Sequence, residues 1–190
     1  MGTKLYLGCG PGYPHDQHIK VMGKDWKTEW TFVDLYVSPE EVPTSNFRQY
    51  NAQNLYEFSD ETIDEIYSSH FLEHVSHLEV KNTLLNWHRK LKPEGKITLN
   101  VPDLEWVARE IVKYENGQLL TSSYFQDFWG DRGLISVLYG SHSHDGEYHK
   151  SGFTKRCLDE LLVDVGFRNV NVSKEFEGHD MGCLISTAIK

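Results

Sequence analysis

Residues 4–12, Lys-Leu-Tyr-Leu-Gly-Cys-Gly-Pro-Gly, place a short apolar run directly before three closely spaced glycines. The run Leu5–Leu7 predicts a strand that is buried on both faces. Gly8, Gly10 and Gly12 let the backbone turn sharply and let a ligand approach main-chain N–H groups without an intervening Cβ. This combination is typical of the first strand and turn of a nucleotide-binding βα unit.

The spacing of the glycines distinguishes between kinds of nucleotide ligand. A dinucleotide fingerprint requires a third glycine where this chain has Tyr13, and no Gly-Lys-Ser/Thr follows as a P-loop would require. Asp34 closes the next apolar run, Thr31–Val33, at roughly the 20-residue separation at which an acidic residue binds ribose hydroxyls. The pattern favours an adenosine-type ligand held between the glycine turn and Asp34.

Composition limits the class of protein. The 190 residues are 39% hydrophobic and 13% aromatic, which suits one globular domain. A formal net charge of −9 argues against a protein that grips nucleic acid through its phosphates. No run is long enough to span a membrane, and no signal-peptide pattern is evident. Cys9, Cys157 and Cys183 are odd in number and far apart, which predicts reduced thiols and a cytoplasmic location.

Alternating periodicities predict a sheet with crossover helices. Further strands are expected at 46–50, 63–67, 96–101, around 170–172 and at 183–189. Helices are expected at 15–22, from a Ser76–Glu79 capping box to before Pro93, from Asp103 to Gly117, and from Thr154 to Gly166. Strands that alternate with helices imply an α/β fold with a mostly parallel sheet and helices on both faces. The last two strands fit an antiparallel hairpin at the edge.

Residues 118–149 fit none of these units, since aromatic side chains such as Tyr124 are mixed there with glycines and several histidines. A segment this long between regular crossovers is more typical of a cover over a site than of a plain connection.

The predicted strand ends converge on one edge. They are Gly8–Gly12, Asp34, Asn51–Asn54, Ser68–His70 and Pro102–Asp103, and all are polar or glycine-rich. Ligands of parallel α/β sheets bind at the carboxyl ends of the strands, where the strand order reverses. This edge is therefore the expected site.

These residues resemble the class I S-adenosylmethionine-dependent methyltransferases, in particular small predicted members that open with a Leu-Gly-Cys-Gly strand end. The matching motifs, in order along the sequence, are Leu7–Gly10, Val33–Asp34, Phe58–Asp64, Ser69–His74, Leu91–Gly95, Val101–Leu104, Tyr139–Gly140, His149–Thr154 and Val165–Phe167. The resemblance covers nearly the whole chain. It implies a Rossmann-like, seven-stranded sheet with an antiparallel last strand, in a single domain over residues 1–190 with a cover insertion at about 118–149.

The resemblance also implies how S-adenosylmethionine is bound. The methionine part and the ribose would lie over Leu7, Gly8, Cys9 and Gly10, and the ribose hydroxyls would bind to Asp34. The adenine would contact Leu35 and would be bordered by Asn51, Ala52 and Gln53. The methionine end would lie near Ser69. Many members carry an acid two residues before the first glycine, where this chain has Tyr6. The contacts of the cofactor ammonium must therefore differ here.

The methyl acceptor, if it is a hydroxyl, needs a general base. His149, where the insertion rejoins the core, is the preferred candidate, followed by His142, with His70 after the fourth strand as a further candidate. For Asp103, the role of a helix N-cap is favoured over that of a base. Glu73 and His74 are expected to form hydrogen bonds that hold together the loop after the fourth strand and the helix that follows it. His142, His144 and His149 are spaced more like a solvated loop than a metal site, so no metal is expected.

The sequence therefore predicts a cytoplasmic S-adenosylmethionine-dependent methyltransferase with a small-molecule or glycan-precursor acceptor, which would release S-adenosylhomocysteine. Two alternatives remain: another transferase using this cofactor, of the aminopropyl type, and a module that binds the cofactor without turnover. Tyr13 argues against a nicotinamide oxidoreductase. The sequence gives no indication of the oligomeric state.

Overall fold

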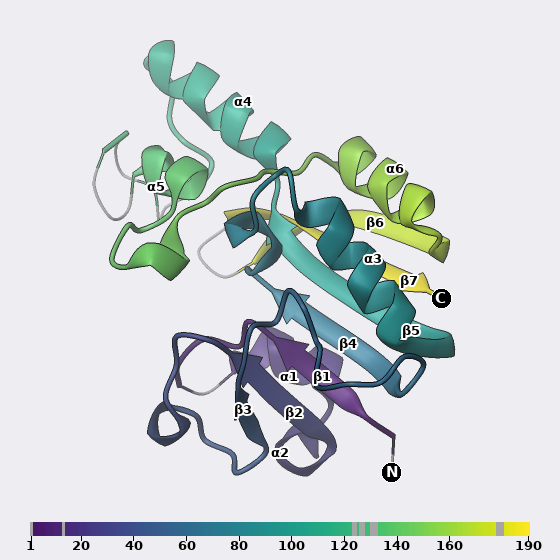
Figure 1. Cartoon of the computed structure of the whole chain (residues 1–190). Coiled ribbons are helices and arrows are strands. Elements are labelled where there is room, and N and C mark those ends of the chain that lie inside the picture. Colours follow the sequence, from purple (N-terminus) through teal and green to yellow (C-terminus); the bar gives the residue numbers. More distant parts are fainter. Residues whose placement is uncertain (1, 13, 123–124, 126–127, 130–132, 178–180) are drawn as a thin grey trace.

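The computed structural model describes residues 2–12, 14–122, 125, 128–129, 133–177 and 181–190. A seven-stranded sheet runs through the molecule in the order β3-β2-β1-β4-β5-β7-β6 (Figure 1). The strands are β1 Lys4–Leu7, β2 Trp30–Asp34, β3 Phe47–Gln49, β4 Ile63–Ser69, β5 Leu91–Pro102, β6 Arg168–Glu177 and β7 Met181–Ile189. β1 to β5 pair in parallel, whereas β7 is antiparallel to both β5 and β6. The predicted α/β architecture with its antiparallel edge is confirmed.

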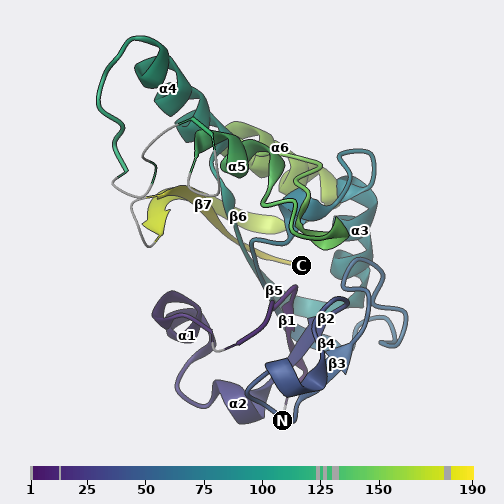
Figure 2. The same ribbon diagram turned by 90° about the vertical axis from the view of Figure 1, so that its left-hand side faces the viewer.

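Helices cover both faces of the sheet. They are α1 Asp16–Met22, α2 Trp26–Glu29, α3 Val80–Lys90, α4 Leu104–Glu115, α5 Leu134–Tyr139 and α6 Lys155–Val165, with short 3-10 turns at Pro39–Glu41, Leu72–His74 and Asp145–Glu147. Figure 2 shows α1 and α2 on one side of the sheet and α3 and α6 on the other.

The alternation of β1 explains the two layers. Leu5 and Leu7 point into the larger core, which the apolar faces of α3 and α6 complete. Tyr6 points to the opposite face, where it packs among side chains such as Met22, Trp26 and Phe32. The same short strand therefore anchors both cores and fixes where the glycine turn begins.

Two of the boundaries that differ from the sequence prediction lie at the two ends of α3. Ser76 does not cap a helix: α3 begins at Val80, and the backbone carbonyl of Ser76 instead accepts the N–H groups of Glu79 and Val80 in a turn. Leu78, expected on the apolar face, lies in this turn and is 77% exposed. β5 begins at Leu91, ahead of the Pro93–Gly95 segment expected only to end the helix, because Leu91 already pairs with Ile63.

The other helix signals are confirmed. The Asp103 side chain caps α4 by accepting the Glu105 N–H, and the Thr154 side chain caps α6 by accepting the Cys157 N–H. Gly166 ends α6 in the left-handed conformation.

The segment 118–149 leaves the sheet after α4 and carries α5. Phe125, Leu134 and Val137 pack there against Trp106 and Val107 of α4. Tyr124 lies outside the described residues. The backbone returns to the core beyond His149, where the N–H groups of Lys150 and Ser151 both donate to the Glu73 carbonyl. Within the described part of the chain, no helix combines the length and apolar character needed to cross a bilayer.

Candidate active site

The glycine turn after β1 has a backbone that other residues would not adopt easily. Gly8 and Gly10 have φ values of 66° and 62°, in the left-handed region. A Cβ at Gly8 would lie 2.4 Å from the Phe71 ring, so both the conformation and the space require glycine. The Gly8 N–H donates to the Val33 carbonyl at 2.8 Å, which ties the turn to the end of β2.

Asp34 faces this turn from the neighbouring strand. Its carboxylate accepts the Gly10 N–H at 3.0 Å and the Tyr36 N–H at 2.9 Å. Leu35, directly after it, is an apolar side chain left 45% exposed. A carboxylate beside an exposed apolar surface suits a ligand with hydroxyls at one end and a flat apolar ring at the other.

A cavity of about 710 Å³ opens beside the turn. It is lined by the predicted Gly8, Gly10, Asp34, Leu35, Asn51, Ala52 and Gln53, and also by His70, Phe71, His74, His144 and Lys150, among others. The segment 51–53 is fixed from behind, since Trp87 Nε1 donates to the Ala52 carbonyl at 2.8 Å and Asn51 Oδ1 accepts the Gln53 N–H at 2.9 Å. The predicted residues of three strand ends thus share one cavity.

A second cavity of about 910 Å³ lies against Tyr6, Cys9, His18 and Ser69. The Tyr6 hydroxyl is 3.0 Å from His18 Nδ1, and His18 Nε2 is 3.3 Å from the Ser69 hydroxyl. Asn100 Nδ2 donates to the same Ser69 hydroxyl at 3.2 Å. Where a family acid was expected, the protein therefore has a hydroxyl–imidazole–hydroxyl relay. Burial, followed by the charge of Asp34, raises the pKa of the Cys9 thiol, which disfavours its nucleophilic thiolate form.

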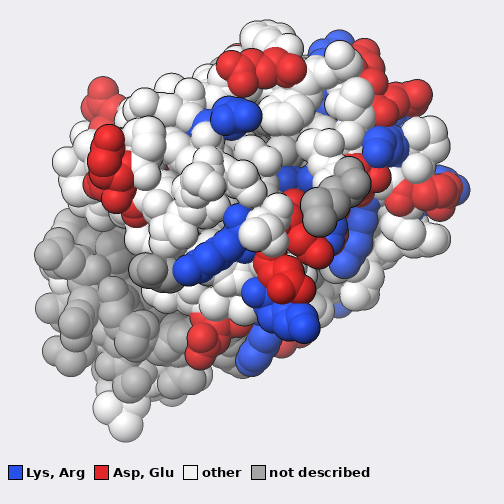
Figure 3. Space-filling view, turned by 90° about the horizontal axis from the view of Figure 1, so that it is seen from below, with Lys and Arg blue, Asp and Glu red and all other residues white. Residues whose placement is uncertain are grey.

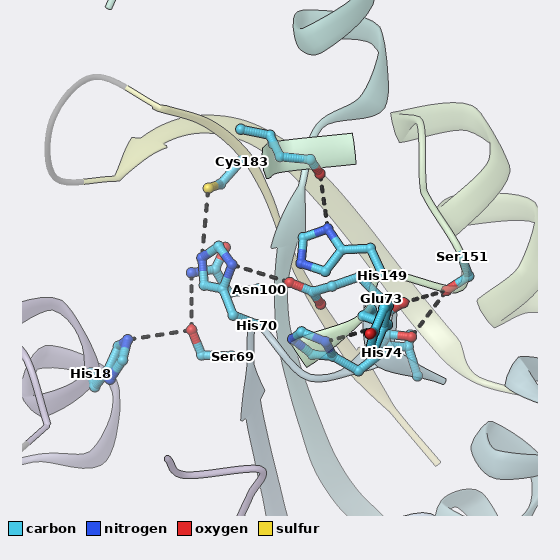
Figure 4. A network of polar contacts seen from close by, with 12 residues as sticks. His18, Ser69, His70, Glu73, His74, Asn100, His149, Ser151 and Cys183 are labelled. Atoms are coloured by element: carbon cyan, nitrogen blue, oxygen red, sulfur yellow. Dashed lines mark hydrogen bonds and ion pairs between the residues drawn. The ribbon is translucent and has the colours of Figure 1, made fainter. Parts of the chain in front are cut away.

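His70 borders both cavities, as do Gly8, Gly10 and Pro11. Its φ is 50°, and its Nδ1 lies 3.1 Å from Glu73 Oε1. Figure 4 shows the Glu73 carboxylate reaching toward the His70 ring. A carboxylate on Nδ1 favours the tautomer in which Nε2 is the proton acceptor. The Cys183 sulfur lies 3.9 Å from that Nε2.

The two other predicted histidines lie elsewhere. His149 borders a separate cavity of about 20 Å³, and its Nδ1 donates to the Val137 carbonyl at 2.8 Å. Burial lowers its pKa. The exposed His142 donates from Nε2 to the Tyr139 carbonyl and packs on the Tyr148 ring. Neither residue is among the described side chains that line the two larger cavities, and Leu7 is buried in β1 without lining them.

Sequence reasoning missed several residues that line the site. His18 has no signal beyond its place in a short helix, and the position of Phe71 under the turn is visible only in three dimensions. Lys150, which also lines the first cavity, belongs to the matching motif His149–Thr154, but that motif does not indicate which cavity the residue lines.

A family model described as a methyltransferase domain matches residues 3–172, which is most of the chain. The chain belongs to this family. The predicted class, a class I S-adenosylmethionine-dependent methyltransferase, is confirmed, and this methyltransferase is therefore an enzyme of that class. No curated protein matches its sequence.

Solved structures support the same fold at low sequence identity. A 1,6-didemethyltoxoflavin-N1-methyltransferase from Burkholderia thailandensis, solved with 1,6-didemethyltoxoflavin and S-adenosylhomocysteine, superposes with a TM-score of 0.63 at 19% identity, over 99% of this chain and 70% of its own. A methyltransferase from Archaeoglobus fulgidus gives 0.63 at 16% identity, over 100% and 86%. A putative methyltransferase from Haloferax volcanii, solved in complex with the activator Trm112, gives 0.60 at 15% identity, over 99% and 82%.

Proposed function

We propose that this methyltransferase binds S-adenosylmethionine across the glycine turn and transfers its methyl group to a small-molecule or glycan-precursor acceptor. One observation carries the proposal: the two large cavities meet at Gly8, Gly10 and His70. One cavity has the chemistry for a nucleoside, and the other leaves room for the methionine end and an acceptor.

The residues present fit the nucleoside part of that cofactor. Asp34 offers acceptor oxygens for two ribose hydroxyls, and exposed Leu35 offers an apolar face for adenine. The backbone of Asn51–Gln53 borders the same space and offers polar groups to the ring edge. The positive φ values at Gly8 and Gly10 favour glycine, and the absence of side chains there leaves the backbone of the turn accessible to a ligand.

The methionine end would lie toward Ser69 and the relay of His18 and Tyr6. This relay has hydroxyl and imidazole acceptors but no carboxylate at position 6. We assign the ammonium to these acceptors and to backbone carbonyls of the turn, which accounts for the departure from the usual family acid.

The cofactor supplies a methyl group already activated on a sulfonium, so the protein needs to align the acceptor and exclude water. Orientation of this kind can contribute roughly 7–11 kcal/mol. Of the three candidate histidines, we retain His70 as the general base because it borders both cavities. For a hydroxyl acceptor, S-adenosylmethionine would supply the methyl group by cleavage of its methyl–sulfur bond, which leaves S-adenosylhomocysteine, and His70 Nε2 would accept the hydroxyl proton.

Several features support a small acceptor. His144, Gly146 and Glu147 of the insertion line the first cavity, so we propose that residues 118–149 form a cover on a single catalytic domain. Among the described residues of the face shown in Figure 3, acidic and basic side chains are interspersed, without the continuous basic patch that nucleic acid would favour. The Burkholderia neighbour is bound to a small molecule. Cys9, Cys157 and Cys183 form no disulfide among the described residues, which supports our proposal of a cytoplasmic location.

The test is to incubate the enzyme with methyl-labelled S-adenosylmethionine and separate small-molecule, protein and RNA fractions of a cell extract. We expect label in the small-molecule fraction and S-adenosylhomocysteine as co-product. Methylthioadenosine as co-product would instead indicate aminopropyl-type transfer. Tight cofactor binding without product in any fraction would indicate a binding module.

A further inference from the structure

Three potential metal ligands meet behind the first cavity. Glu73 and His74 lie on the 3-10 turn Leu72–His74 after β4, whereas His149 arrives from the end of the insertion. One ligand atom from each lies within 4.8 Å of the other two. Figure 4 shows the His74 and His149 rings beside the Glu73 carboxylate, from which a dashed line leads to the His70 ring.

Glu73 carries an unsatisfied oxygen. The residue is only 1% exposed, and its Oε1 contacts His70 whereas Oε2 has no hydrogen-bond partner. A buried carboxylate normally has both oxygens hydrogen-bonded or bound to a metal.

Both histidines are oriented as metal ligands usually are. His149 Nδ1 donates to the Val137 carbonyl at 2.8 Å, and His74 Nδ1 donates to the Tyr148 carbonyl at 3.3 Å. A backbone carbonyl on one ring nitrogen fixes the tautomer and leaves Nε2 as the ligand atom. The two ring centroids are 4.8 Å apart.

We propose that Glu73, His74 and His149 bind one divalent transition metal ion of the zinc type. Two imidazoles and one carboxylate are a donor set that Zn²⁺ accepts, with a fourth position left for water. The cavity of about 20 Å³ beside Glu73 and His149 is large enough for one water molecule. The ion would join the end of the insertion to the core and would neutralise the free oxygen of the carboxylate that contacts His70.

The experiment is calorimetric titration of chelator-treated protein with Zn²⁺, followed by Co²⁺ absorption to report coordination geometry. We expect one equivalent to bind and a tetrahedral Co²⁺ spectrum. His74→Ala and His149→Ala should each weaken Zn²⁺ affinity by at least about tenfold, since disturbing even an outer partner of a ligand costs 10–100-fold. His142→Ala is the matched control, because this exposed histidine of the same segment is outside the cluster.

Equal Zn²⁺ binding by wild type and by the folded His74→Ala variant would overturn the proposal, as would an equal loss in His142→Ala. Affinity for S-adenosylhomocysteine is measured on the same metal-free samples. Failure of the metal site therefore leaves the proposed methyl transfer standing, and failure of cofactor binding leaves the metal site standing.

Discussion

Asp34→Ala removes the acidic group on which the nucleoside assignment depends. The carboxylate of Asp34 lines the first cavity and already orients the Gly10 and Tyr36 N–H groups. A hydrogen bond to a charged group contributes about 1.5–3 kcal/mol, so loss of the ribose contact should weaken binding by about 2 kcal/mol. At 1.4 kcal/mol per tenfold, this is roughly a 30-fold rise in Kd.

Calorimetric titration with S-adenosylhomocysteine measures this change directly. Asp34→Asn keeps one acceptor oxygen and should fall between wild type and Asp34→Ala. Asp25→Ala is the control, because Asp25 is an exposed acid that lines neither cavity. An unchanged Kd in a folded Asp34→Ala protein would refute the ribose assignment.

Three further predictions follow from other parts of the molecule. In urea melts, Gly8→Ala should lower the free energy of unfolding by about 3 kcal/mol, because the new Cβ overpacks against Phe71 and the backbone is left-handed. Gly12→Ala has open space around the new Cβ, so its free energy of unfolding should fall by only about 1 kcal/mol. In His70→Asn, the asparagine can adopt the positive φ of this position, and kcat on a hydroxyl acceptor should fall by about 10²–10⁴-fold without a change in cofactor affinity. An undiminished kcat would remove His70 from the mechanism. Burial, followed by the charge of Lys190, lowers the pKa of His88, so the unfolded protein takes up a proton more readily and the stability of the fold should fall as the pH drops below about 6.5. In thermal melts His88→Gln should lessen this fall, whereas His77→Gln, at an exposed histidine, should not. Identical pH profiles for wild type and His88→Gln would contradict the prediction.

The sequence was informative where one local signal determines structure. Glycines that require positive φ, helix caps such as the side chains of Asp103 and Thr154, and the alternation of β1 each act over a few residues. The predicted start of α3 was wrong because a serine can serve either as a helix cap or as the first residue of a turn. In the structure Ser76 begins a turn, in which the His77 N–H donates to the distant Lys150 carbonyl.

The residues of the site that follow strands could be predicted, because the carboxyl ends of parallel strands must lie at the same edge of the sheet. Spacing alone could not show that the cofactor edge is split into two cavities or that His70 stands between them. The position of His149 depends on how the insertion returns to the core, through the contacts of Lys150 and Ser151 with Glu73. These contacts join residues far apart in the sequence, and no local pattern encodes them.

The most direct test of the central claim is a crystal structure of the protein with S-adenosylhomocysteine. We predict both ribose hydroxyls within hydrogen-bond distance of the Asp34 carboxylate, the adenine against Leu35, and the thioether sulfur on the His70 side of the glycine turn. A ligand bound elsewhere, or one in this crevice whose ribose makes no contact with Asp34, would contradict the account.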